Sequence, residues 1–108
     1  MNYRKVTAII RRDVLEKVER EPQALSVRGI SVTKVKGYGE YADFYSRDWM
    51  VSHARIETFT TESQADVIAQ AIMETAHVGL EGDGIVALLP VEKLYRIRTR
   101  SEATSDEA

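Results

Sequence analysis

Cysteine is absent from this chain of 108 residues. Its absence excludes disulfides, thiolate catalysis and metal sites built on cysteine. Long hydrophobic runs are missing as well, because no stretch approaches the about 18 consecutive apolar residues of a membrane-spanning helix. The N-terminal segment MNYRKVTAII has too short an apolar stretch for a signal peptide. We therefore expect a cytoplasmic protein that does not insert into a membrane.

No charge of one sign is in excess, since 15 Lys and Arg face 17 Asp and Glu, for a formal net charge of -2. Basic pairs such as Arg11-Arg12 are diluted by acids, which disfavours a nucleic-acid surface. The two histidines, His53 and His77, match no metal spacing. Walker, Gly-x-Ser-x-Gly and His-Glu-x-x-His motifs are also missing. Neither an enzyme nor a metal site is expected.

The length and the apolar share of 44% predict one globular domain with a single core. Hydrophobic periodicity predicts the secondary structure. The expected strands cover residues 3–10, 29–37, 53–60 and 85–90, the expected helices cover 12–21 and 62–77, and a short last strand or extended arm covers 94–99.

Four local signals set the limits of these elements. Pro22 is expected to stop the first helix, because proline disfavours helix at the residue before it. Thr61 and Gln64 have the spacing of a capping box at the start of the second helix. Gly79 suits the left-handed position after that helix. The continuous apolar run 85–90, which ends in proline, is typical of a strand buried on both faces.

The resulting order is β-α-β, a loop, β-α-β and a tail strand. It predicts an α+β, ferredoxin-like βαββαβ fold (split βαβ), with an antiparallel sheet, two helices on one face and an extra C-terminal strand. The domain would span residues 1–100, with a loop at 40–52, and the acidic tail 101–108 would be disordered. Such a fold hosts many functions, so the function must be argued from a site.

Gly82-Asp83-Gly84 is the first candidate for a site. Glycines let a backbone approach a ligand closely, and successive N–H groups in such a turn can form an anion-binding nest. The same tripeptide is also an ordinary turn between a helix and a strand. Gly37-Tyr38-Gly39 leaves a similar choice, between a slot for a flat ring and the plain start of a loop.

Arg96 and Arg98 are the second candidate. In an extended chain these two residues share a face, where two guanidinium groups repel unless an anion or an acid lies between them. Arginine matches phosphate oxygens with two parallel hydrogen bonds. The alternative is a solvated edge strand, on which charges protect against aggregation.

The order and spacing of VTKVKGYG, GDG, LPVE and RIRT over about residues 3–99 resemble the PII signalling protein family. The resemblance implies a ferredoxin-like protomer in a homotrimer, with an adenine nucleotide (ADP, AMP or ATP) as a regulatory ligand in each cleft between subunits. It also implies regulation of a partner transporter or enzyme through a loop, here residues 40–52. We expect a PII-like member with a shortened loop.

The resemblance also implies which residues bind the nucleotide, and some of these positions depart from the family. Ile85 stands where the family has a lysine after Gly-Asp-Gly, and His53 stands where it has a second lysine, so ADP or AMP should compete well with ATP. Glu40 is a poor partner for a dicarboxylate, which disfavours 2-oxoglutarate sensing. The implied nucleotide-binding residues are Ser31, Gly37, Tyr38, Gly39, Glu40, His53, Gly82, Asp83, Gly84, Arg96 and Arg98.

Three functions remain open at this point. The leading hypothesis is a non-catalytic sensor linked to carbon metabolism, which binds bicarbonate beside the nucleotide and engages its partner through the aromatic loop 40–52. A second is a slow ATPase, with Asp83 or Glu57 as the base. A third is a trimeric assembly protein that has lost its ligand, which Ile85 and His53 favour and the arginine pair opposes.

Overall fold

The computed structural model describes residues 2–24, 29–36 and 51–104. Most of the predicted loop 40–52 therefore lies outside the described residues. The helices and strands, in chain order, are β1 (Tyr3–Arg11), the 3-10 turn η1 (Arg12–Val14), α1 (Leu15–Ala24), β2 (Ser31–Lys36), β3 (Val51–Thr61), α2 (Glu62–Ala76), β4 (Gly84–Val91), β5 (Tyr95–Arg96) and β6 (Ser101–Glu102).

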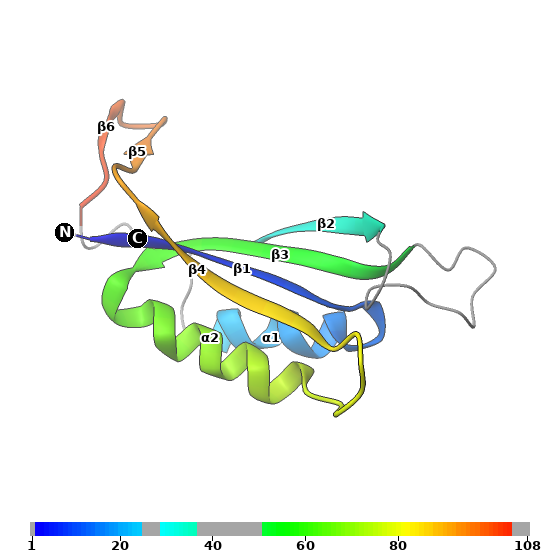
Figure 1. The fold of residues 1–108 in the computed structure, drawn as a ribbon. Coiled ribbons are helices and arrows are strands. Elements are labelled where there is room, and N and C mark those ends of the chain that lie inside the picture. Colours follow the sequence, from blue (N-terminus) through cyan, green and yellow to red (C-terminus); the bar gives the residue numbers. More distant parts are fainter. Residues whose placement is uncertain (1, 25–28, 37–50, 105–108) are drawn as a thin grey trace.

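Four strands form one sheet in the order β2-β3-β1-β4, and every neighbouring pair is antiparallel. Both helices lie on the same face of this sheet (Figure 1). The arrangement is the predicted ferredoxin-like α+β fold, which is thereby confirmed. In the ranges that the structure describes, the helices are too short or too polar for any of them to span a membrane.

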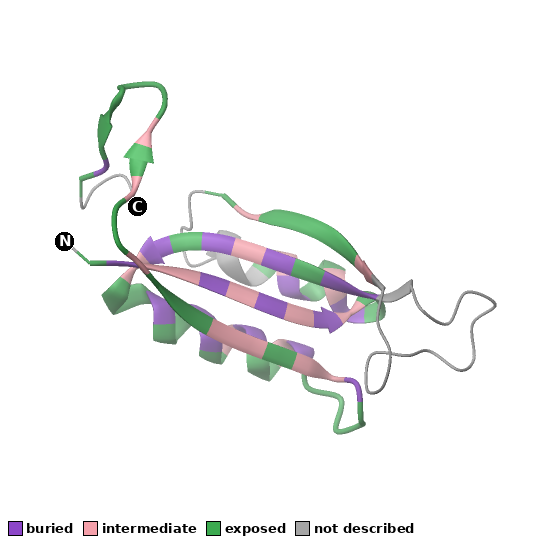
Figure 2. Cartoon of the chain, turned by 45° about the horizontal axis from the view of Figure 1, so that its top comes forward, coloured by how far each residue is buried: buried purple, intermediate pink, exposed green. Residues whose placement is uncertain are grey.

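The core lies between the sheet and the two helices. Along β1, Val6, Ala8 and Ile10 are buried, whereas the residues between them are only partly buried. This alternation, visible along β1 in Figure 2, arises because successive side chains of a strand point to opposite faces. Ile68 and Ile72 of α2 complete the same cluster. The predicted periodicity of both elements is therefore confirmed.

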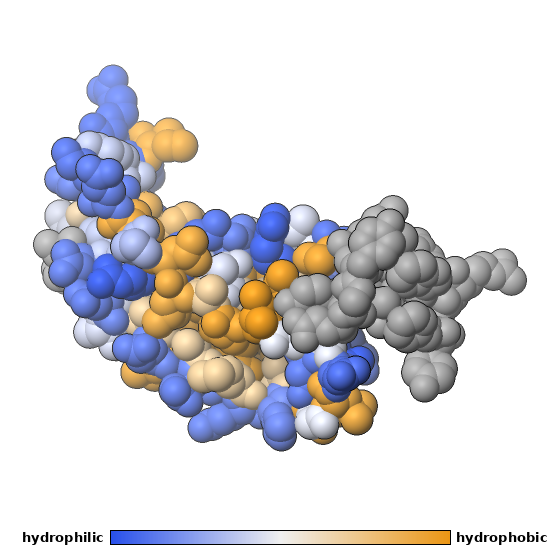
Figure 3. All heavy atoms as spheres, in the orientation of Figure 1, coloured by the Kyte–Doolittle hydropathy of each residue, from blue (hydrophilic) through white to orange (hydrophobic). Residues whose placement is uncertain are grey.

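Most of the sheet face opposite the helices is not covered by described residues, although the C-terminal segment covers the end at Tyr3. The strand registers place Phe59 and Leu89 on either side of Lys5, and these two apolar side chains are 45% and 41% exposed. Ile85 is 50% exposed. Figure 3 shows apolar atoms gathered along β4, the edge of the sheet. The prediction that residues 85–90 are buried on both faces is therefore wrong for the single chain, because β4 has only one strand neighbour and only one layer of helices.

Two prolines lie inside elements that they were expected to end. α1 runs to Ala24, beyond Pro22, since the effect of proline on the residue before it is a bias and not a strict stop. β4 runs to Val91, beyond Pro90. Because β4 pairs only with β1, a residue without an N–H group can be accommodated at this edge.

The predicted capping box at α2 is not formed. Thr61 is the N-cap residue, but its hydroxyl lies 3.2 Å from the hydroxyl of Ser63 and makes no cap hydrogen bond. The carbonyl of Asn2 instead accepts the N–H of Glu62 at 2.9 Å. A neighbouring segment thus satisfies a free N–H of the first turn, which local spacing could not reveal.

The C-terminal segment forms a separate hairpin. β5 and β6 pair with each other and not with the main sheet, and residues 97–100 form the turn between them. The predicted arm 94–99 therefore folds back after Arg96. Ordered structure also passes the predicted boundary at residue 100. The hairpin projects from the end of β4 (Figure 1).

Candidate functional site

The loop of residues 77–84 links α2 to β4 and contains the predicted Gly-Asp-Gly turn. Gly79, Gly82 and Gly84 have φ values of 92°, 86° and 109°, which a residue with a β-carbon rarely adopts. The left-handed conformation predicted for Gly79 is confirmed. At Gly84 a β-carbon would lie 1.7 Å from the carbonyl oxygen of Ile9, so this backbone is pressed directly against β1.

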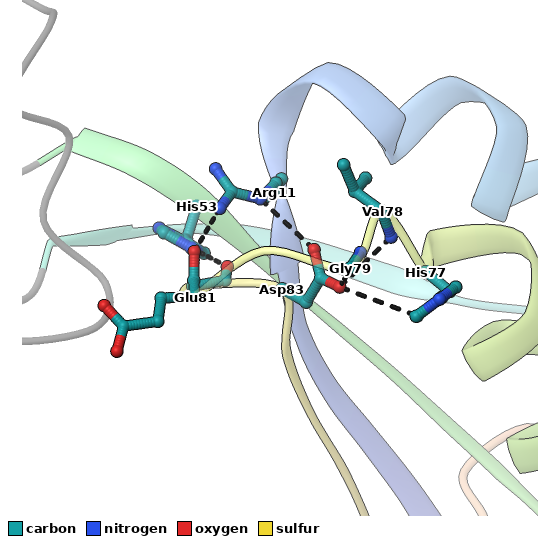
Figure 4. Close-up of polar contacts among 8 residues, drawn as sticks. Arg11, His53, His77, Val78, Gly79, Glu81 and Asp83 are labelled. Carbon is teal, nitrogen blue, oxygen red and sulfur yellow. Dashed lines mark hydrogen bonds and ion pairs between the residues drawn. The ribbon is translucent and has the colours of Figure 1, made fainter.

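The carboxylate of Asp83 holds the loop in this shape (Figure 4). It accepts the N–H groups of Gly79 at 2.8 Å and Val78 at 3.0 Å, and it pairs with Arg11 Nε at 3.4 Å. The hydrogen bond from Gly79, the one from Val78 and the contact with Arg11 lower the pKa of Asp83. His77 Nδ1 lies 3.7 Å from the same carboxylate. Asp83 is thus a positioning residue, whose carboxylate is engaged by its own loop and by Arg11.

Two further side chains attach the loop to the sheet. His53 of β3, only 1% exposed, places Nε2 2.7 Å from the carbonyl oxygen of Gly82. Arg11 of β1 donates to the carbonyl of Glu81 as well as to Asp83. The structure therefore brings His53 to the predicted loop, but as a buried anchor and not as an exposed cation.

Arg11 is a site residue that the sequence analysis did not identify. It was considered only as part of a short basic run with Arg12. Its register partner on β3 is His53, so the two loop anchors lie side by side on adjacent strands. The one available signal was that strand register, which depends on a pairing between residues far apart in the sequence.

A cavity of about 350 Å³ adjoins the loop, between α2 and the start of β4. Ile72, Met73 and Val86 contribute apolar lining, and His77 and Asp83 contribute polar groups. Its volume falls at the lower end of the range of small-molecule sites. The loop therefore borders space that a ligand could enter.

The C-terminal hairpin carries the second part of the predicted site. Tyr3 donates its buried hydroxyl to the carbonyl of Ala103 at 2.9 Å, and the N–H of Ala103 donates to the carbonyl of Leu94 at 2.8 Å. These bonds fix the base of the hairpin to the end of the sheet. Arg96 and Arg98 lie beyond this base, but Arg98 belongs to the turn, so the predicted extended pair is replaced by a folded one.

Strand β4 separates the two parts of the site. Its eight residues span about 25 Å in an extended conformation. The loop 77–84 lies at one end of β4 and the hairpin lies at the other (Figure 1). One chain therefore cannot bring both to the same phosphate group.

The structure does not place the remaining five predicted residues beside the loop. Ser31 pairs with Glu57, farther along β3 than His53, and so does not reach the loop of its own chain. The other four, Gly37, Tyr38, Gly39 and Glu40, lie outside the described residues. Within residues 2–24, 29–36 and 51–104, no cluster of three histidine or acidic side chains is suited to hold a metal ion.

Comparisons with known proteins agree with this architecture. The family model described as "Nitrogen regulatory protein P-II" matches residues 3–101. The chain is 34% identical over 106 residues to a nitrogen regulatory protein P-II of Pasteurella multocida (strain Pm70), covering 92% of this chain and 95% of the relative. It is 32% identical over 103 residues to one of Azospirillum brasilense, covering 89% and 92%.

A solved structure gives the same result in three dimensions. The crystal structure of Arabidopsis thaliana PII bound to citrate matches with a TM-score of 0.82 and 28% identity, and the match covers 99% of this chain and 92% of that one. Sequence and fold thus agree over nearly the whole chain. The chain belongs to the family of nitrogen regulatory proteins P-II.

Proposed function

We propose that this chain is a non-catalytic signal-transduction protein that binds an adenine nucleotide between neighbouring subunits of a homotrimer. One observation carries the proposal: the glycine loop and the arginine hairpin lie at opposite ends of β4. Each is half of a phosphate site, and only a second copy can supply the missing half.

The two halves are chemically complementary. At residues 82–84 the backbone can approach a phosphate closely, and its shape is fixed from behind by Asp83, Arg11 and His53. Arg96 and Arg98 offer guanidinium groups that match phosphate oxygens. No ion pair joins either arginine to a described carboxylate, so both remain available for an anion.

The loop supplies little positive charge of its own. Ile85, which directly follows Gly84, is half-exposed and apolar, and His53 is buried. Arg11 is already engaged by Asp83 and Glu81. Because charge matters most for a triphosphate, the loop by itself gives ATP little advantage over ADP or AMP.

Trimer formation would also cover the apolar residues of the open sheet face. Phe59 and Leu89 are 45% and 41% exposed in the single chain. Exposed apolar patches of this kind mark interaction sites. Copies assembled through this face of the sheet would remove these side chains from water.

The regulatory output is a proposal of the same kind. Nucleotide binding alters how loop 40–52 engages a partner transporter or enzyme in the cytoplasm, and a small anion such as bicarbonate binds beside the phosphates. The Arabidopsis PII in the matched structure is bound to citrate, which supports the idea that this fold accepts a small carboxylate anion.

A trimeric assembly protein without a ligand is the second candidate, favoured by apolar Ile85 and buried His53. A slow ATPase is less well supported, because both candidate bases are engaged. Asp83 binds its own loop, and Glu57 lies 2.6 Å from Lys5.

Calorimetric titration of the purified protein with AMP, ADP and ATP, with and without bicarbonate or 2-oxoglutarate, tests the proposal. Saturable nucleotide binding, strengthened by bicarbonate and not by 2-oxoglutarate, is expected. The Arg96→Ala/Arg98→Ala variant should lose about 1.5–3 kcal/mol of binding free energy per charged hydrogen bond while remaining a trimer in sedimentation. Absence of binding by the unmodified protein would leave the assembly protein as the better interpretation.

A further inference from the structure

Arg100 closes the turn of the C-terminal hairpin in an unusual conformation. Its φ is 54°, and within the ranges that the structure describes no other non-glycine residue has a positive φ. Its N–H donates to the carbonyls of Arg96 at 2.9 Å and Ile97 at 3.3 Å, so this conformation is what closes the turn. Glycine would adopt it without steric cost. That an arginine stands here instead of glycine indicates that its side chain has a function.

The turn gathers three arginines within five residues. The backbone bond from Arg100 to Arg96 folds the chain back, so that the turn carrying Arg98 joins two other arginines. None of the three forms an ion pair with a described carboxylate. The Nε atom of Arg96 is buried and has no hydrogen-bond partner among the described residues. Like charges gathered on one short turn repel each other unless an anion is bound among them.

Among the residues that the structure describes, no carboxylate of the same chain supplies this anion. The hairpin projects from the end of the sheet (Figure 1), and its base is fixed by Tyr3 and Ala103. The glycine loop of a second copy, in turn, lacks a free cation, because Ile85 is apolar and Arg11 is engaged by Asp83. The C-terminal hairpin thus carries an excess of positive charge, and the glycine loop of the second copy lacks positive charge.

We propose that Arg100 is a third anion-binding arginine, which contacts the terminal phosphate of a nucleoside di- or triphosphate held against the glycine loop of a second copy. The inference rests on the proposed nucleotide site and adds its specificity-determining residue. Arg100 makes affinity increase with the number of phosphates, and it replaces the cation that Ile85 cannot provide.

Three substitutions separate the charge of Arg100 from its backbone conformation. Arg100→Gln keeps the β-carbon at positive φ but removes the charge. Arg100→Gly removes the β-carbon and the charge. Arg100→Lys keeps the β-carbon and the charge. Titration with AMP, ADP and ATP should show that Gln and Gly weaken ATP binding about tenfold and AMP binding less than about threefold. Arg100→Lys should retain most of the preference for ATP, because lysine keeps the positive charge although it cannot donate two parallel hydrogen bonds as arginine does.

Arg20→Gln is the matched control, because Arg20 is an exposed arginine on α1 whose side chain is 70% accessible. It should leave all three affinities unchanged. Equal losses for AMP and ATP, a loss confined to Arg100→Gly, or no loss at all would overturn the role of Arg100. If the unmodified protein binds no nucleotide, the proposed function itself fails, which is a different result.

Discussion

Gly84 shows how one residue without a side chain determines the shape of the loop. A β-carbon there would lie 1.7 Å from Ile9 O and 2.7 Å from Ile9 C, both backbone atoms of β1, and φ is 109°. We expect Gly84→Ala to lower the free energy of unfolding by at least about 3 kcal/mol, because neither strand can move without losing ladder hydrogen bonds. Chemical denaturation measures this change.

Gly29 provides the matched control for that substitution. A β-carbon at Gly29 would meet nothing within 4 Å. Gly29→Ala should therefore change the free energy of unfolding by less than about 0.5 kcal/mol. Similar effects of the two substitutions would contradict the close approach of Gly84 to β1.

Asp83 gives the loop a defined dependence on pH. Its pKa is lowered by hydrogen bonds from Gly79 and Val78 and by Arg11, so folding favours the charged carboxylate. Such a group contributes its stability fully above its ordinary pKa of about 3.9, and that contribution is lost as pH falls through the lowered value. The difference in thermal midpoint between the unmodified protein and Asp83→Asn should thus be largest near neutral pH and shrink below about pH 4.

Asp66→Asn controls for the loss of a carboxylate as such. Asp66 is exposed on α2 and forms no ion pair with a described residue. Asp66→Asn should leave the change of the thermal midpoint at acidic pH the same as in the unmodified protein. A difference for Asp83→Asn that stayed constant down to the lowest pH would show that the carboxylate does not hold the loop.

At this scale the sequence predicted turn chemistry well and long-range anchoring poorly. Gly79 and the 82–84 turn follow from what glycine permits locally. The burial of His53 beneath Gly82 and the contact of Arg11 with Asp83 depend on the pairing of β1 with β3, which no local pattern specifies.

Among the elements, the hairpin β5–β6 is bonded to β1 through the hydroxyl of Tyr3. Tyr3 is 4% exposed, and its hydroxyl bonds to the carbonyl of Ala103. Tyr3→Phe should cost about 1 kcal/mol of stability, speed hydrogen exchange at the Ala103 N–H and weaken the proposed nucleotide binding, because the arginines lose a fixed base. Exchange measured by NMR or mass spectrometry reports this directly.

Tyr95→Phe is the control, since Tyr95 lies in the hairpin itself and is 60% exposed. It removes the same hydroxyl from a position where the described residues offer it no hydrogen bond. Exchange at Ala103 should match that of the unmodified protein. If both substitutions had the same effect, the hairpin would be held by something other than the bond from Tyr3.

The elements with the clearest hydrophobic periodicity were predicted best. Alternation along β1 and the apolar stripe of α2 identified both correctly. β4 was predicted to be buried on both faces, because a continuous apolar run looks the same whether its cover comes from the same chain or from another copy. The arm 94–99 was predicted to be extended, because the turn that Arg100 closes has no glycine to signal it.

For the whole molecule, the central question is whether the proposed nucleotide site is shared between two copies. Two variants can each remove one half of it. Arg96→Ala/Arg98→Ala removes the hairpin half, and Ile85→Glu places a carboxylate beside the loop at a position that is 50% exposed and so tolerates the change. Trimers of either variant alone should bind nucleotide far more weakly than the unmodified protein, because every proposed site lacks one half.

Mixed trimers distinguish a shared site from one within a single chain. If the two variants are co-expressed with different tags and purified through both, every trimer contains at least one copy of each. In a closed ring with head-to-tail contacts, an intact loop meets an intact hairpin once per mixed ring, whichever variant is in the majority. Calorimetry should therefore give roughly one nucleotide per trimer. A site within one chain would restore none, because each copy would still carry its own defect.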